Sequence, residues 1–168
     1  MQGVEELGTE FEFHVVSAAY WFRTGREARA APPASMDIFN APSREVCTLR
    51  RGRSNTPLQA LVTLNDVQFV EAARVLAEHS METAADFDSR LDFLSTRLLA
   101  RPLSLTEKQM AKRSLDEFRR HYQLNPEDAT KLLTTGERKA NPALPPADYA
   151  AMTMLVNQFL NLDEALNK

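Results

Sequence analysis

The chain of 168 residues is long enough for one domain whose core buries roughly two thirds of the surface that the unfolded chain exposes. With 43% apolar and 26% charged residues, it has the composition of an ordinary globular protein. Seven arginines but only three acids fall within residues 23–53, yet the pI of about 5.7 argues against a nucleic-acid binder.

The cysteine count and the N-terminal sequence limit which cofactors the segment can hold and where in the cell the chain is expected. Cys47 is the only cysteine, so it cannot form an intramolecular disulfide, and no Cys/His ligand spacing occurs. We therefore predict no metal site and no cofactor in this segment, which could not hold a covalent c-type haem. No signal peptide is evident, and no apolar run approaches the roughly 18–20 residues of a membrane span. As written, the chain is expected to stay in the cytoplasm.

The first third of the chain is the least regular. Residues 1–30 show a strand-like alternation around Phe13 and a helix-like spacing around Ala19, and we favour the helix. Residues 31–56 contain three prolines and a glycine with little helical periodicity. This pattern predicts an extended segment that crosses the surface.

A helix start is predicted at Pro57. Thr56 is a preferred N-cap, Pro57 suits the first helical position, and Gln59 can complete a capping box. Apolar residues then recur at spacings of three and four, so one face is expected to be buried. That face comprises Leu58, Leu61, Val62, Phe69, Ala72, Ala73 and Leu76. Most polar residues fall elsewhere around the axis, among them Gln59, Glu71, Arg74 and Glu78.

This apolar stripe is interrupted at one point. Asn65 would place an amide among the leucines of a continuous helix, and the next residue, Asp66, is itself a preferred N-cap. We therefore predict two helices, over residues 57–64 and 67–79, that meet at a tight corner.

Two further helices are predicted before residue 123. The first is capped by Asp86 or Asp88 and ends near Arg101, because Pro102 bars continuation. Its inner face is expected to hold Leu91, Leu94 and Leu98. The second begins with Thr106 as cap and Gln109 as its partner. This second helix is expected to run to about residue 122. Leu105 and Met110 occupy the positions of a hydrophobic staple, and the buried face is expected to hold Met110, Leu115, Phe118 and Tyr122.

A shorter helix and a final amphipathic helix complete the pattern. Asn125 and Pro126 start the shorter one, which ends near Gly136. After a proline-rich loop over residues 137–146, the final helix carries its apolar face on Tyr149, Met152, Leu155, Val156 and Phe159. The sequence therefore predicts an all-α fold, an irregular bundle of five to six helices with an extended N-terminal segment.

Two stretches carry a family resemblance: DIFNAPSREVCTLRRGRSNTPLQALVTLNDVQFVEAARVLAEHS and, at the end, NQFLNLDEALNK. They resemble the C-terminal part of a planctomycete-associated family, domain of unknown function 1553, over about residues 35–168. The resemblance implies the end of a longer exported protein, preceded by another uncharacterised domain and often by a cytochrome c-like module. It implies no known activity and no catalytic residues.

Two features depart from that family. Its members often have a proline where this chain has Val67, so the predicted corner depends on Asp66 alone. Residues 1–34 form a poorly matched leader that does not look like the family's upstream sequence. Either the chain is a truncated product with an unrelated leader, which we favour, or it is a divergent member.

Three arginines form the sharpest candidate binding site. Arg50, Arg51 and Arg53 precede a helix N-terminus, and guanidinium groups pair bidentately with carboxylate, sulfate or phosphate. The competing interpretation, which we favour, is that they pair with acids of the same domain and hold the extended segment to the helices.

The asparagines form a second set. Asn157 and Asn161 are one helical turn apart, and Asn55 and Asn65 lie near the predicted corner, where buried amides can bind free backbone groups. We therefore predict structural roles for these four asparagines, and for Asp66 as a cap. The three histidines are scattered without ligand spacing, and no catalytic arrangement is visible.

Two functions remain in view. The first is a non-catalytic interaction or scaffold module from the C-terminal end of a larger exported multidomain protein, whose partners are its upstream domains. The second is a fragment of an enzyme or binding protein that acts on anionic, sulfated or carboxylated, glycans through Arg50, Arg51 and Arg53. Electron transfer would require a partner domain to supply the haem.

Overall fold

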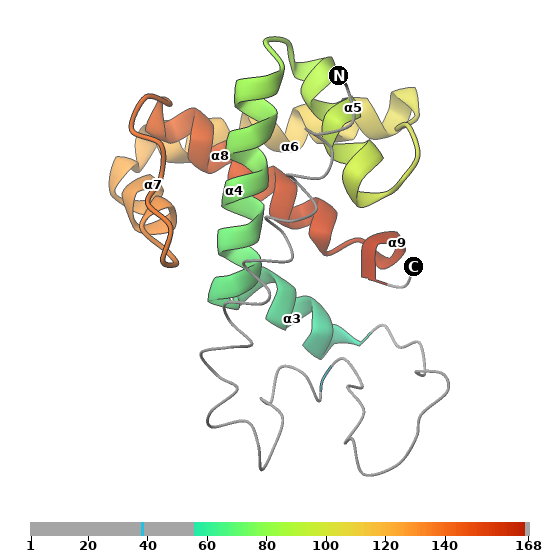
Figure 1. Ribbon diagram of the computed structural model, residues 1–168, viewed down its shortest axis with the longest axis horizontal. Coiled ribbons are helices and arrows are strands. Elements are labelled where there is room, and N and C mark those ends of the chain that lie inside the picture. The colour runs from blue at the N-terminus through green and yellow to red at the C-terminus, as the bar shows by residue number, and fades with distance from the viewer. Residues whose placement is uncertain (1–37, 39–55, 167–168) are drawn as a thin grey trace, which may run out of the picture. The chain divides into compact units, whose positions relative to one another are not determined.

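The fold is that of a computed structural model, which describes residue 38 and residues 56–166. The chain divides into two units, residues 1–54 and 55–168, and the description below concerns the second. Its described residues form seven helices and no strand (Figure 1). They are α3 (Pro57–Asn65), α4 (Val67–Thr83), α5 (Phe87–Leu98), α6 (Leu105–Leu124), α7 (Pro126–Leu133), α8 (Pro146–Leu160) and α9 (Asp163–Leu166). The prediction of an all-α bundle is confirmed.

Helix α8 is the centre of this unit. Nine of its fifteen residues are buried, and it packs against α3, α4, α5, α6, α7 and α9. Figure 1 shows α4 crossing α8. Ala150 and Ala151 are fully buried on α8, and Ala73 and Ala77 are fully buried on α4, so small side chains let helix backbones approach closely. The buried apolar positions predicted for α8 are all confirmed.

The predicted start of α3 and the corner after it are confirmed. The side-chain oxygen of Thr56 accepts a hydrogen bond from the amide of Gln59, and Oε1 of Gln59 accepts one from the amide of Thr56. Asp66 ends α3 and starts α4, because its Oδ1 accepts from the amide of Gln68 at 2.9 Å. One carboxylate therefore turns the chain from one helix into the next.

The expected apolar face of α3 is wrong. Leu58 and Leu61 are 53% and 58% exposed, whereas Gln59 and Thr63 are buried. Helix α3 meets α8 through its polar side, where Thr63 Oγ1 donates to Oδ1 of Asn161 at 2.7 Å. This hydrogen bond satisfies two polar groups whose burial would otherwise be costly.

Helices α5 and α6 confirm one predicted cap and correct the other. Asp86 caps α5, and Leu91 and Leu94 are fully buried as expected. Helix α6, however, is capped by Ser104 and not by Thr106. Ser104 and Glu107 form a capping box, in which the amide of Ser104 donates to Oε2 of Glu107 at 2.7 Å.

The start of α6 at Leu105 also overturns the predicted hydrophobic staple. Leu105 is 81% exposed and Met110 is 60% exposed, so neither contributes to the core. The helix starts two residues earlier than expected, but the predicted burial of Leu115 and Tyr122 is confirmed, and Ala111 joins them on the inner face.

The segments around α7 and α9 differ in detail from expectation. Asn125 occupies the N-cap position of α7, but its side chain donates to the carbonyl of His121 in the preceding helix. Helix α7 ends at Leu133, and Gly136 follows with a φ of 96°, in the left-handed region that favours glycine. The short α9 was not predicted. None of the helices in the described range is long and apolar enough to cross a membrane.

Candidate functional site

The predicted arginine cluster lies outside the residues that the structure describes. This holds for Arg50, Arg51 and Arg53, and also for Asn55. Their pairing with an anion or with acids of the same domain therefore stays a prediction.

The other predicted polar residues gather where α3 meets α4 and the end of α8. Asn65 is exposed, and its Nδ2 donates to the carbonyl of Leu61 at 2.8 Å. Asn157 is fully buried, and its Nδ2 lies 3.4 Å from the carbonyl of Leu64. Asn161 accepts from Thr63, as described above. Each of these amides contacts a group near a helix end.

A buried polar cluster joins α4, α8 and the loop before α8. Arg74 and Glu78 lie on α4 and are 0% and 5% exposed. The hydroxyl of Tyr149 on α8 donates to Oε2 of Glu78 at 2.6 Å, and Nη2 of Arg138 in the loop lies 3.4 Å from Oε1. The two carboxylate oxygens of Glu78 therefore bind groups from two other parts of the fold.

The guanidinium of Arg74 reaches the same loop. Its Nη2 donates to the carbonyl of Arg138 at 2.5 Å and lies 3.7 Å from Oε1 of Glu71. That same Glu71 oxygen accepts from the amides of Glu137 and Arg138 at 3.0 and 2.6 Å. A Cβ at Gly136 would lie 2.4 Å from Cδ of Glu71, so only glycine allows this approach. Nε and Nη1 of Arg74 are buried without a hydrogen-bond partner in the described part of the chain.

The electrostatics of this cluster centre on Tyr149. Burial raises the pKa of its phenol well above the usual value of 10.0, and the hydrogen bond to Glu78 adds to the rise. The phenol therefore keeps its proton and acts as a hydrogen-bond donor. The cluster contains two carboxylates and two guanidiniums, whose charges balance, as burial of charged groups requires.

Sequence reasoning placed Arg74 and Glu78 away from the buried face, and this expectation is wrong. A usable signal was present, because Arg74 shares a face with Val70 and Ala77, at spacings of four and three. The decisive partners, Tyr149 and Arg138, lie 60 or more positions later and could not be read from local spacing.

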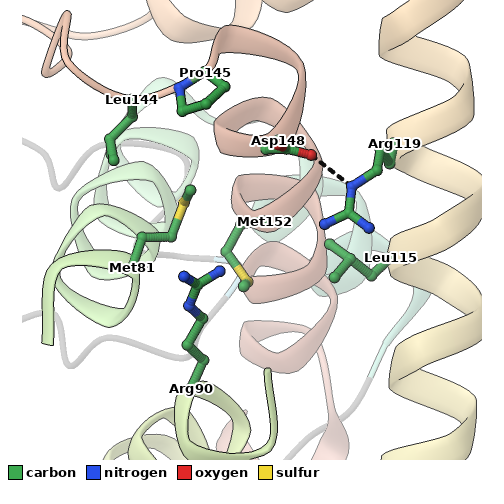
Figure 2. Close-up of a pocket in the computed structure, with 8 residues that line it drawn as sticks. All are labelled: Met81, Arg90, Leu115, Arg119, Leu144, Pro145, Asp148 and Met152. Atoms are coloured by element: carbon green, nitrogen blue, oxygen red, sulfur yellow. Dashed lines mark hydrogen bonds and ion pairs between the residues drawn. The ribbon is translucent and has the colours of Figure 1, made fainter. Parts of the chain in front are cut away.

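A pocket lies on another side of α8. It has a volume of about 220 Å³ and is lined by residues of α4, α5, α6, α8 and the loop before α8 (Figure 2). Arg119 and Asp148 form an ion pair at 2.5 Å on one wall, and Arg90 contributes a second guanidinium. Figure 2 shows these two guanidinium groups on either side of Met152.

A third charged cluster holds α9 against the start of α6. Nη2 of Arg101 lies 2.8 Å from both Oε1 of Glu107 and Oε2 of Glu164. Pairing with Arg101, and then hydrogen bonds with Ser104, lower the pKa of Glu107 to about 2. Within residues 38 and 56–166, no three His, Cys, Asp or Glu side chains are grouped so that they could hold a metal ion.

These observations define a helical domain in which charged side chains of residues 56–166 form ion pairs between helices and loops. A family model described as PSD1, protein of unknown function (DUF1553), matches residues 18–115. The chain belongs to this family. The matched range begins and ends earlier than the range over which the resemblance was expected. Neither a curated protein nor a solved structure matches the chain.

Proposed function

We propose that this chain is a non-catalytic interaction or scaffold module from the C-terminal end of a larger exported protein. The observation that supports it best is the buried cluster, in which Tyr149 of α8 donates to Glu78 of α4 and the buried guanidinium of Arg74 binds the loop before α8. These ionisable groups stabilise one arrangement of helices and are closed to a substrate. In this proposal the segment itself carries no cofactor, and any haem belongs to an upstream cytochrome c-like module.

Exposed apolar side chains near the α3–α4 corner supply the proposed contact surface. Leu58 and Leu61 lie one turn apart on α3, and Val67 is the first residue of α4; all three are more than half exposed. Large apolar groups gathered on a surface are typical of sites that bind another protein. We propose the upstream domains of a longer homologous protein as the partner.

The test mixes the full chain with the separately purified upstream region of a longer family member and measures binding by isothermal titration calorimetry. Replacing Leu58 and Leu61 together by Asp is expected to weaken the complex at least about tenfold, because two charges would enter an apolar contact. Leu105→Asp is the matched control, since Leu105 is 81% exposed on α6, away from the corner. Absence of a wild-type complex, or equal weakening by Leu105→Asp, contradicts the proposal.

The alternative function is binding or turnover of anionic glycans through Arg50, Arg51 and Arg53. Its support is the concentration of seven arginines in residues 23–53. Binding of a sulfated oligosaccharide to the wild type and to Arg53→Ala tests it, with Arg120→Ala as a control for general charge. Equal binding by the wild type and both variants would rule the arginine site out.

A further inference from the structure

The pocket of Figure 2 combines an apolar lining with cationic groups. Met81 of α4, Leu115 of α6 and Met152 of α8 line it together with Leu144 of the preceding loop. Methionine side chains are flexible and adapt to the shape of an apolar ligand. The volume of about 220 Å³ corresponds to roughly seven water molecules, at about 30 Å³ each in the liquid. The space therefore suits a ligand of small organic-acid size.

Two guanidiniums of the lining each retain a terminal nitrogen for such a ligand. Arg90 donates through Nε to the carbonyl of Ala84 at 2.8 Å and through Nη2 to that of Ala85 at 3.1 Å. These bonds hold the side chain in place at the end of α4. Within the described residues, Nη1 of Arg90 has no hydrogen-bond partner. A fixed guanidinium with a spare donor loses little conformational entropy when it binds an anion.

Arg119 is held in a similar way from the opposite wall. Its Nε donates to Oδ1 of Asp148 at 2.5 Å, and its Nη1 lies 3.6 Å from Oδ1 of Asp116. Nη2 of Arg119 has no partner among residues 56–166. The charged groups lining the pocket are Arg90, Arg119 and Asp148, which sum to one positive charge. One negative charge on a ligand would balance them.

From this combination we infer that the pocket binds a short amphiphilic monocarboxylate. Its carboxylate pairs with Nη2 of Arg119, Arg90 adds a positive charge from the other side of Met152, and the aliphatic tail lies against Met81 and Met152. Guanidinium–carboxylate pairs are charge-assisted and can be bidentate, so they are stronger than hydrogen bonds between neutral groups. The inference concerns a different surface from the α3–α4 corner, so either proposal can fail without the other.

Hexanoate is a suitable probe, because it joins a carboxylate to a five-carbon tail. Titration into the full chain, labelled on its methionine methyl groups, is followed by NMR. We expect saturable shifts at Met81 and Met152 and none at Met110, which is exposed on α6. Hexanamide, which lacks the charge, and acetate, which lacks the tail, are expected to bind at least about tenfold more weakly.

Three variants test the role of the charges. Arg119→Gln is expected to weaken hexanoate binding about tenfold, because one charge-assisted hydrogen bond is lost. Asp148→Asn is expected to tighten it several-fold, since it removes a competing negative charge while the amide oxygen can still accept from Nε of Arg119. Arg120→Gln, which alters an exposed arginine beside Arg119 that does not line the pocket, is expected to leave binding unchanged.

Several results would overturn the inference. These are the absence of saturable shifts at millimolar hexanoate, equal binding of hexanamide, weaker binding by Asp148→Asn, or equal weakening by Arg120→Gln. If Arg119→Gln fails to fold, as circular dichroism would reveal, the hexanamide and Asp148→Asn measurements still decide, because both retain the arginines at positions 90 and 119.

Discussion

The hydroxyl of Tyr149 donates a 2.6 Å hydrogen bond to Oε2 of Glu78, and both side chains are buried between α4 and α8. The two residues are 71 positions apart in the sequence, so this bond fixes the relative orientation of two packed helices that are far apart along the chain. Arg138 supplies a partner for the other carboxylate oxygen. Loss of the phenol would leave a buried, charged oxygen without its donor, which is more costly than loss of a surface hydrogen bond.

Tyr149→Phe is therefore expected to lower the free energy of unfolding by about 1–3 kcal/mol. Urea unfolding followed by circular dichroism measures the change. Tyr122→Phe is the matched control, because Tyr122 is also buried but its hydroxyl makes no hydrogen bond within the described residues. Equal losses in the two variants would show that the Tyr149–Glu78 bond contributes nothing of its own.

The stability of the protein should also fall in alkali because of Tyr149. Burial, and then Glu78, raise the pKa of this phenol above its ordinary value in the folded state only. The resulting contribution is complete below about pH 10 and falls by up to about 1.4 kcal/mol per pH unit as the pH rises towards the folded-state pKa. Between about pH 9 and about pH 11.5, the wild type should lose stability more steeply than Tyr149→Phe. Parallel curves would contradict this expectation.

Gly136→Ala tests the close approach of the loop to Glu71. The new Cβ would meet the Glu71 carboxylate, and alanine is strained at a φ of 96°. We expect a loss of about 1–3 kcal/mol in the free energy of unfolding. Lys139→Ala in the same loop changes an exposed side chain and should stay within about 0.5 kcal/mol of the wild type. A neutral Gly136→Ala would show that the loop can move away from α4.

Acid stability should depend on Glu107. Its pKa is lowered from 4.5 to about 2 by Arg101 and then by Ser104, so its contribution is complete above pH 4.5 and is lost as the pH falls towards 2. Melting temperatures measured between about pH 6 and about pH 2.5 should decline less steeply for Glu107→Gln than for the wild type. Glu117→Gln, on an exposed part of the same helix, should follow the wild-type slope.

The cap of α6 gives a direct comparison of two neighbouring residues. Ser104→Ala removes the acceptor of the Glu107 amide and is expected to cost about 1 kcal/mol. Thr106→Ala lies inside the helix and should change stability by less than about 0.5 kcal/mol. Thermal melting measures both, and a larger cost at Thr106 would restore it as the cap.

Local chemistry explains which parts of the fold could be predicted. Thr56 and Asp66 each bind a backbone amide within three positions, so their roles as caps follow from nearby residues alone. Ser104 with Glu107 and Thr106 with Gln109 both have the spacing of a capping box, and the prediction of Thr106 took the wrong pair. Arg101 also binds Glu107 and so reinforces the box of Ser104, and this contact depends on how the chain folds before α6.

The candidate sites depended on contacts that spacing cannot reveal. Charged residues on a helix are usually solvated, so local spacing predicts an outer position for Arg74 and Glu78. Their burial follows from Tyr149 and Arg138, which the fold brings to them from beyond residue 137. The pocket beside Arg119 likewise needs side chains from four helices and a loop, and no single stretch of sequence contains it.

The central position of α8 has a consequence for synthesis on the ribosome. Helices α4, α6 and α7 all rest on a helix that begins only at Pro146. Until that helix leaves the ribosome, their apolar faces lack the surface that covers them. The earlier helices therefore remain partly ordered, with these faces exposed to solvent. A product that stops before Pro146 should therefore be a target for chaperones and proteases, although most of its helices have already been made.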